Sequence, residues 1–206
     1  MARVAIAISI VLVITSPAVA QNLLVNPGFD DPDQLDGWTC TTNDGGIAVW
    51  SPEDHQGSTG SGSMEHEVSA TIDDRWVRCW QCVPVRQYWP YVGSAWYYWP
   101  NDPDVSQDGK TVVTLSFFSD ANCTVSLSSG GGHNAFPVLD TWVQTVTSEF
   151  VAPAGANSAG FYVFTWQYTA NQPVRARLDD LDFSARVLFW DDFESGGTGA
   201  WSATNP

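Results

Sequence analysis

Short runs rich in Val, Thr, Trp, Tyr and Phe follow one another along this chain, separated by clusters of Gly, Asn, Asp and Pro. After residue 20, no long stretch repeats its apolar residues with the period of a helix. Runs of this kind bounded by turn-forming residues are typical of strands, and their close spacing is typical of sheets packed face to face. The sequence therefore predicts an all-β fold, a two-sheet β-sandwich of the jelly-roll kind. Strands are expected at residues 22–25, 37–42, 46–50, 63–70, 76–85, 91–99, 111–119, 123–128, 142–151, 159–168 and 174–184.

The run "GFYVFTWQYT", residues 160–169, carries bulky side chains on both faces of its predicted strand. Successive side chains of a strand point to opposite sides of the sheet. One face therefore holds Phe161, Val163 and Thr165, and the other holds Tyr162, Phe164, Trp166 and Tyr168. A two-layer sandwich needs only one of these faces for its core. The second face is then either covered by a further layer or an exposed aromatic surface that binds a partner.

The two ends of the chain differ from its middle. Residues 1–20 resemble a secretory signal peptide, because Arg3 precedes a short apolar run and small residues follow at Ala18 and Ala20. Residues 21–186 are expected to form one sandwich domain, and residues 187–206, where the composition changes, a separate tail. We expect the protein to be secreted or held at the cell surface, with no segment inserted in a membrane once the leader is removed.

Acidic residues dominate the charge, with 23 Asp and Glu against eight Lys and Arg and a formal net charge of −15. Nucleic acids and anionic membranes are repelled by such a chain, so neither is expected as a partner. A neutral partner or a cation suits the charge better. We expect a monomer.

Four cysteines, in a chain expected to be exported, predict two disulfides. Four cysteines allow three pairings. Cys79 and Cys82 are three positions apart, so on a strand they point to opposite faces and are poorly placed to bridge each other. We favour Cys82 with Cys123 and Cys40 with Cys79.

Several motifs occur in a characteristic order between residues 22 and 185. They are "NLLVNPGFDD", "LDGWT", "GSMEHEV", "QCVPVRQYWPYVGSAWYYW", "TVVTLSFFSDANC", "TWVQTVTSEFVAPAGANSAGFYV" and "RARLDDLDFS". Together they resemble carbohydrate-binding modules of the CenC-like group, within the galactose-binding-domain-like jelly rolls. Residues 187–206 resemble a tail found at the ends of various exported bacterial proteins.

The resemblance implies a non-catalytic module that binds glycans. Sugar rings present flat apolar C–H faces edged by hydroxyls, so such a site needs aromatic planes flanked by polar groups. The register of the family turns Trp96 and Tyr98 outward, and we expect the outward row of the 159–168 strand to lie on a neighbouring strand. The candidate carbohydrate-binding residues are Trp96, Tyr98, Tyr162, Trp166, Gln167 and Arg175. The alternative for each ring is a position in the core, where Trp and Tyr are common.

A structural calcium ion is also implied by the resemblance, with Asp30 and Asp179 at the matching positions. Calcium prefers oxygen ligands supplied by carboxylates and backbone carbonyls. The two residues belong to the first and last predicted strands, which are neighbours in this architecture, so an ion there would link the two ends of the domain. The alternative is that these carboxylates form turns or are simply solvated.

The sequence gives little support for a catalytic function. The three histidines show no zinc-ligand spacing, and no Ser stands in a "GxSxG" elbow. The sequence therefore favours a secreted, non-catalytic protein that stacks a polysaccharide on aromatic side chains. The alternative is an extracellular structural or surface interaction module that does not bind sugar.

Overall fold

The computed structural model describes residues 21–30, 34–43, 45–69, 72–169 and 172–186. The predicted leader, residues 1–20, and the predicted tail, residues 187–206, lie outside the described residues. Within the described ranges there is no helix, and hence none long and apolar enough to cross a membrane.

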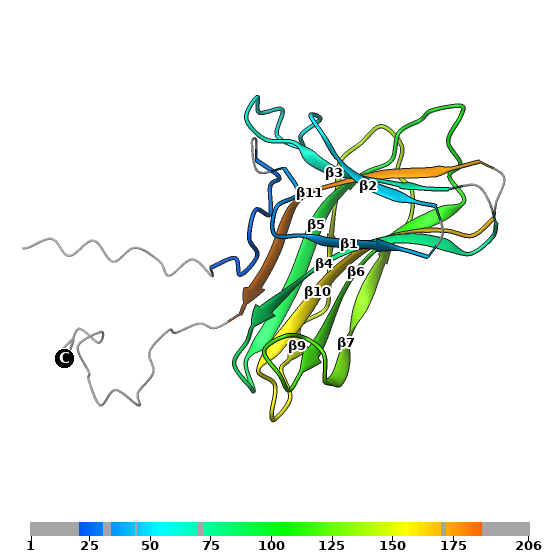
Figure 1. The fold of residues 1–206 in the computed structure, drawn as a ribbon. Helices are drawn as coiled ribbons and strands as arrows, with labels where there is room; N and C mark the ends of the chain where they lie inside the picture. Colours follow the sequence, from blue (N-terminus) through cyan, green and yellow to red (C-terminus); the bar gives the residue numbers. More distant parts are fainter. Residues whose placement is uncertain (1–20, 31–33, 44, 70–71, 170–171, 187–206) are drawn as a thin grey trace, which may run out of the picture. The chain divides into compact units, whose positions relative to one another are not determined.

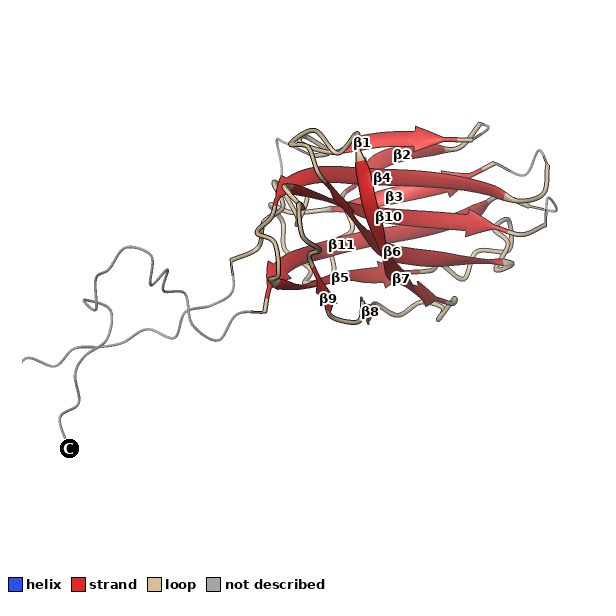
Figure 2. Ribbon diagram, turned by 90° about the horizontal axis from the view of Figure 1, so that it is seen from below, coloured by secondary structure: helices blue, strands red, loops and turns tan. Residues whose placement is uncertain are grey.

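Two antiparallel sheets make up the fold, as predicted (Figure 1). The strands are β1 (Thr39–Thr42), β2 (Ile47–Ser51), β3 (Ser63–Val68), β4 (Arg75–Pro84), β5 (Pro90–Tyr98), β6 (Gly109–Phe118), β7 (Ser126–Ala135), β8 (Val143–Val146), β9 (Phe150–Val151), β10 (Ser158–Gln167) and β11 (Val174–Ala185). The five-stranded sheet has the order β1-β4-β10-β6-β7, and the six-stranded sheet has β2-β3-β11-β5-β8 with β9 paired to β5. Figure 2 shows the strands from below, where β10 runs between β4 and β6.

Strand β10, which contains most of the run "GFYVFTWQYT", lies at the centre of the five-stranded sheet. It pairs with β4 on one side and β6 on the other along its whole length, from Ser158 to Gln167. Phe161 and Val163 are fully buried, whereas Tyr162, Phe164 and Trp166 are partly exposed. The predicted alternation is confirmed: one row of β10 fills the core and the other lies on the outer face of the sheet.

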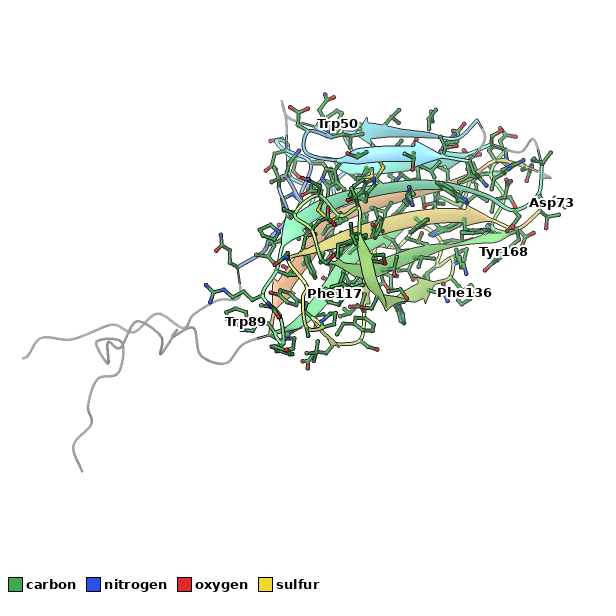
Figure 3. All side chains as sticks on the ribbon, turned by 60° about the horizontal axis from the view of Figure 1, so that its bottom comes forward. Trp50, Asp73, Trp89, Phe117, Phe136 and Tyr168 are labelled. Carbon is green, nitrogen blue, oxygen red and sulfur yellow. A yellow bond between two sulfur atoms is a disulfide. The ribbon has the colours of Figure 1, made fainter. Side chains whose placement is uncertain are left out.

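The core lies between the two sheets. Leu115, Phe117 and Phe161 from the five-stranded sheet meet Tyr91 and Phe183 from the six-stranded sheet. The Phe161 ring is 5.9 Å from the Phe183 ring, centroid to centroid. In Figure 3, Phe117 lies within the sandwich, Trp89 at one end of it, and Tyr168 and Asp73 at the other end. Burial of large apolar side chains from both layers is the main term that holds the sheets together.

The first described segment, residues 22–29, lies beside the last strand. The Leu23 N–H donates to the Phe183 carbonyl at 2.9 Å, and the Leu181 N–H donates to the Pro27 carbonyl at 3.0 Å. The pairing between these segments amounts to one isolated β-bridge, between Asn22 and Ser184, so the strand predicted at 22–25 does not form. The predicted proximity of the first and last segments is nevertheless correct.

Strand β7 departs from the sequence prediction. The strand predicted at 123–128 instead spans Ser126–Ala135, so the glycine-rich segment "SSGGGHN" lies inside β7, on the edge of the five-stranded sheet. The pairing of β6 with β7 shifts register between Leu115 and Ser116, and Gly131 there has a φ of 88°. A glycine-rich run allows the left-handed backbone of a bulge as readily as that of a turn, so its composition does not separate the two.

Both predicted disulfides are present. Cys40 and Cys79 are direct partners in the pairing of β1 with β4, with Cα atoms 4.1 Å apart. Cys82 joins Cys123, which precedes β7, with Cα atoms 5.9 Å apart. Because Cys79 is buried and Cys82 lies on the outer face of β4, the argument from strand alternation against a Cys79–Cys82 bridge is confirmed.

Candidate functional site

The outer face of the five-stranded sheet carries a group of partly exposed rings on its two adjacent strands β4 and β10. We name this group the aromatic strip: Trp76, Trp80, Tyr162, Phe164 and Trp166. In the strand register, Trp166 lies opposite Trp76, and Tyr162 lies opposite Trp80. Alternation along both strands thus brings two aromatic rows side by side, because residues directly opposite across a pair of strands share a face.

The rings of the aromatic strip pack against one another. Trp80 and Tyr162 are stacked, with centroids 5.7 Å apart and ring planes 21° from parallel. Trp76 meets Phe164 edge to face at 6.0 Å. A Cβ at Gly160 would lie 2.5 Å from the Tyr162 hydroxyl, so the absent side chain of this glycine makes room for the Tyr162 ring. With the tilted pair Tyr162 and Phe164 at 6.4 Å, these contacts join four of the five rings into one aromatic group.

Arg78 lies in the middle of the aromatic strip, opposite Phe164 in the strand register. Its guanidinium carbon is 5.3 Å from the centre of the Trp76 ring and 5.6 Å from that of Tyr162, within the range of cation–π attraction. Its Nε donates to the Thr41 hydroxyl at 3.3 Å. A guanidinium has five N–H groups. The described residues supply no acceptor for its Nη atoms, which are left to bind a ligand or water.

A hollow of about 310 Å³ borders the strip on the β6 side. Its lining combines apolar, hydroxyl, amide and ammonium groups from Lys110, Val112, Thr114, Gly132, Asn134, Phe164 and Trp166. The Trp166 indole N–H donates to the Asp74 carboxylate at 2.7 Å, which fixes the ring at the rim. A recess with one aromatic wall and several polar groups suits a ligand with apolar faces and hydroxyl edges, such as a sugar ring.

A second hollow, of about 330 Å³, lies where residues 27–30, the 54–61 loop and β11 meet. We name it the acidic hollow. It is lined by the carboxylates of Asp30, Asp54 and Asp180, together with Pro27, Gly28, Gln56, Ser58 and Ser61. A register shift in the pairing of β11 with β5, between Asp179 and Asp182, accompanies a φ of 45° at Asp180. Of the two predicted calcium ligands, Asp30 lines the hollow and Asp179 is buried behind it.

Asp179 is held by the 54–61 loop and its own strand. Its carboxylate accepts the His55 N–H at 2.8 Å and the Asp180 N–H at 2.7 Å. The pKa of Asp179 is raised to about 8, mainly by burial and also by a side-chain hydrogen bond with Asp54. Acidic side chains thus crowd one corner of the domain. Among the described residues, no three His, Cys, Asp or Glu side chains form a ready-made metal site.

No protein-family model matches the chain, and no curated protein matches it. Solved structures do. The enzymatically active domain of tailspike protein 4 of bacteriophage CBA120 superposes with a TM-score of 0.61 at 14% identity, over 80% of this chain but only 21% of the tailspike chain. TmCBM61, solved with β-1,4-galactotriose, gives 0.53 at 14% identity over 81% of this chain and 100% of its own. A family 16 carbohydrate-binding module gives 0.51 at 18% identity over 79% and 99%.

The chain has the β-sandwich fold of carbohydrate-binding modules. It spans nearly the whole of such a module but about a fifth of the tailspike chain. The fold predicted from the resemblance is therefore confirmed. Membership of the CenC-like group stays a prediction.

Within this module fold, the predicted binding residues do not share one surface. Trp96 and Tyr98 lie on β5 in the six-stranded sheet, whereas Tyr162 and Trp166 lie on β10 in the five-stranded sheet. The expectation that the two rows occupy neighbouring strands is wrong, because the neighbours of β10 are β4 and β6. The period of a strand tells which residues share a face, but not which strands share a sheet.

The outward rings of β5 have partners of their own. Trp96 stacks on the His55 imidazole at 3.8 Å between centroids, and Tyr98 lies 5.4 Å from Trp142. The Tyr98 hydroxyl donates to the Asp140 carboxylate at 3.1 Å. These rings anchor the 52–58 segment and the residues before β8 onto the six-stranded sheet, and this packing explains their position without a ligand.

Two predicted polar contacts lie away from the aromatic strip. Gln167 is fully buried, and its amide donates to the Gln172 carbonyl at 2.6 Å, so it faces the core rather than a ligand. Arg175 lies on the six-stranded sheet, where its Nη2 pairs with Glu67 at 2.8 Å. Alternation from Trp166 already places Gln167 on the inner face, so this expectation is corrected by the same rule that predicted the strip.

Sequence reasoning missed the β4 half of the strip. The run "RWVRCWQC" places Trp76, Arg78 and Trp80 at alternate positions, which is the signal of one shared face. That run was interpreted only through its cysteines. Asp54 and Asp180 were missed as neighbours of Asp30, because the 54–61 loop folds back onto β11 by contacts that no sequence period indicates.

Proposed function

We propose that this protein binds a polysaccharide by stacking sugar rings on the aromatic strip, and that it does so outside the cell without breaking bonds. The observation that carries this proposal is the alignment of five partly exposed rings on the adjacent inner strands β4 and β10. Central strands of a two-layer sandwich need no large apolar side chains on their outer face. Keeping such rings in contact with water is costly unless a ligand covers them.

The chemistry of the strip matches that of a glycan. The apolar C–H face of a sugar ring stacks on an aromatic plane, and its hydroxyls exchange hydrogen bonds with polar groups at the rim. Thr114 and Asn134 in the hollow offer such groups on one side of the rings, and Thr41 offers another beside Arg78. TmCBM61, which has the same fold, was solved with β-1,4-galactotriose, and this supports the proposal at the level of fold.

Intrinsic tryptophan fluorescence provides the direct test, because three of the five rings are indoles. We expect titration of the purified chain with a panel of soluble glucans, xylans, mannans and galactans to shift or quench the emission for at least one polymer. The same polymer cast in a native gel should retard the protein. If no glycan in the panel does either, the proposal fails, and a structural or surface interaction module becomes the better description.

We also propose that a structural calcium ion binds in the acidic hollow. Carboxylate oxygens of Asp30, Asp54 and Asp180 have the donor chemistry that calcium prefers, and backbone carbonyls and water would complete its shell. A divalent cation would offset the repulsion between these crowded carboxylates. Bound there, the ion would connect residues 27–30 with the 54–61 loop and β11.

Calcium is accordingly expected to raise the melting temperature. An ion that binds only the folded state stabilises it by about 1.4 kcal/mol when present at roughly ten times its Kd. Differential scanning fluorimetry in calcium and in chelator measures the shift. The variant Asp180→Asn should lose the response, while Asp104→Asn, in an exposed loop away from the hollow, should keep it. Identical melting temperatures with calcium and with chelator would remove the ion from the description.

A further inference from the structure

Acidic residues are absent from the strands of the five-stranded sheet. Strands β1, β4, β6, β7 and β10 contain no Asp or Glu, although the chain has 23 such residues. The same strands carry Arg75, Arg78 and Lys110. The six-stranded sheet, by contrast, has carboxylates on both β3 and β11. The charge of this acidic protein is thus unevenly divided between its two sheets.

Two cations on the outer face of the five-stranded sheet have no carboxylate partner among the described residues. They are Arg78, at the centre of the aromatic strip, and Lys110, which lies opposite Trp166 and lines the hollow. On the six-stranded sheet, Arg175 and Arg177 pair with Glu67 and Glu65 at 2.8 and 2.9 Å. Arg78 and Lys110 thus differ from the two arginines of the six-stranded sheet, whose charges are offset by neighbouring carboxylates.

Two acidic groups at this end of the sheet accept hydrogen bonds from other side chains. Asp74 accepts the indole N–H of Trp166 at 2.7 Å, and Asp108 accepts the hydroxyl of Thr169. The ammonium nitrogen of Lys110 instead lies 5.8 Å from the centre of the Trp166 ring. The two cations therefore lie on either side of the β10 rings, Arg78 on β4 and Lys110 on β6.

We infer that the glycan bound by the aromatic strip carries uronate carboxylates on a mainly neutral backbone. This inference rests on the proposed function. A sugar ring stacked on the rings of β10 would place a carboxylate within reach of the Arg78 Nη atoms or of the Lys110 ammonium. Guanidinium binds carboxylate with two parallel hydrogen bonds, and such charge-assisted bonds are stronger than those to a hydroxyl.

The net charge of the protein favours a polymer that carries few carboxylates over one that carries many. The formal net charge of −15 repels a polymer with a carboxylate on every ring. At physiological salt this repulsion fades over a Debye length of about 8 Å, whereas contacts at a partly buried cation are screened less. A neutral polymer with isolated carboxylates is attracted to these cations and avoids most of the repulsion from the net negative charge of the protein.

A matched pair of polymers tests this inference. Xylan branched with glucuronate and the same polymer after reduction of its carboxylates to alcohols differ only in charge, and an arabinogalactan bearing glucuronate supplies a second such pair. We expect the wild-type chain to bind the acidic member of a pair at least about fivefold more tightly by isothermal titration calorimetry. Raising the salt concentration to 0.5 M should shrink that ratio, because screening weakens the pairing.

Variants then assign the preference to the two cations. Arg78→Gln and Lys110→Gln should each bring the ratio toward one by weakening binding of the acidic polymer more than binding of the reduced polymer, and Arg78→Lys should keep part of the preference. The matched control is Arg86→Gln, which removes an exposed positive charge away from the strip. If Arg78→Gln proves unfolded, Lys110→Gln alone decides.

The possible failures are distinct. Equal wild-type affinity for the acidic and reduced members overturns the inference but leaves glycan binding intact. An unchanged ratio in both folded glutamine variants also overturns it. Binding to neither polymer pair nor any member of the glycan panel overturns the proposed function, and this inference with it.

Discussion

Alanine in place of Trp166 is expected to weaken glycan binding by about 2 kcal/mol or more, roughly 30-fold in Kd. Trp166 contributes the largest ring on β10, at the rim of the hollow and directly opposite Trp76. Its indole N–H is fixed by Asp74, so the ring is already oriented before a ligand arrives. Removal of such an aromatic anchor takes away both its contact area and the wall of the hollow. Isothermal titration with the best polymer of the panel measures the loss.

The matched control for this variant is Trp96→Ala, on the opposite sheet. Trp96 is also partly exposed, but it stacks on His55 and shares no face with the strip. Its removal should lower the melting temperature and leave the Kd within about twofold of wild type. Near-ultraviolet circular dichroism and thermal melts establish that both variants are folded. The reverse outcome, with Trp96→Ala defective and Trp166→Ala normal, would transfer the site to the six-stranded sheet.

Lowering the pH from 7 to 4 is expected to reduce the free energy of unfolding by about 3 kcal/mol through His66 alone. His66 is fully buried between the sheets, where its Nδ1 lies 3.1 Å from the Thr165 hydroxyl. Its Nε2 faces the sulfur atoms of Met64 and Cys79, at 3.0 and 3.3 Å. None of these neighbours is an anion that could offset a charge on the ring. Burial therefore lowers the pKa of His66 from 6.5 to about 3.

The direction of the effect follows from where the proton binds. Below pH 6.5 the unfolded chain takes up a proton at His66, but the folded chain does not until the pH approaches 3. Stability from this residue is thus complete above pH 6.5 and falls steadily as the pH decreases toward 3. Urea titrations at several pH values give the unfolding free energy of wild type and of His66→Gln. The difference between the two should shrink on acidification, and a difference that stays constant from pH 7 to pH 4 would show that His66 does not titrate as described.

Much of the fold could be predicted from local patterns. Alternation along residues 160–169 predicted which side of β10 faces the core, and turn residues bounded most of the strands. Opposite faces of β4 excluded a Cys79–Cys82 bridge, and the pairing preferred among the two that remained is the one observed. These inferences depend only on residues close together in sequence, where the geometry of a strand decides the outcome.

The site was harder to predict because it depends on which strands become neighbours. Nothing in the period of β5 or β10 states that they belong to different sheets, so Trp96 and Trp166 were expected to lie on adjacent strands. Arg175 was misplaced for the same reason, since its partners Glu65 and Glu67 come from β3. The acidic hollow depends on a loop that returns to β11, a contact between residues more than a hundred positions apart.

Both cross-links of the domain start on β4, at Cys79 and Cys82, and Trp80 lies between them. One fastens the strand to β1 and the other fastens it to the segment before β7. A strand that is cross-linked on both sides loses little conformational freedom when a ligand binds. Binding to such a surface therefore costs less entropy than binding to a surface that must first become ordered. Oxidation of the four thiols during folding thus makes β4 rigid before any ligand binds to it.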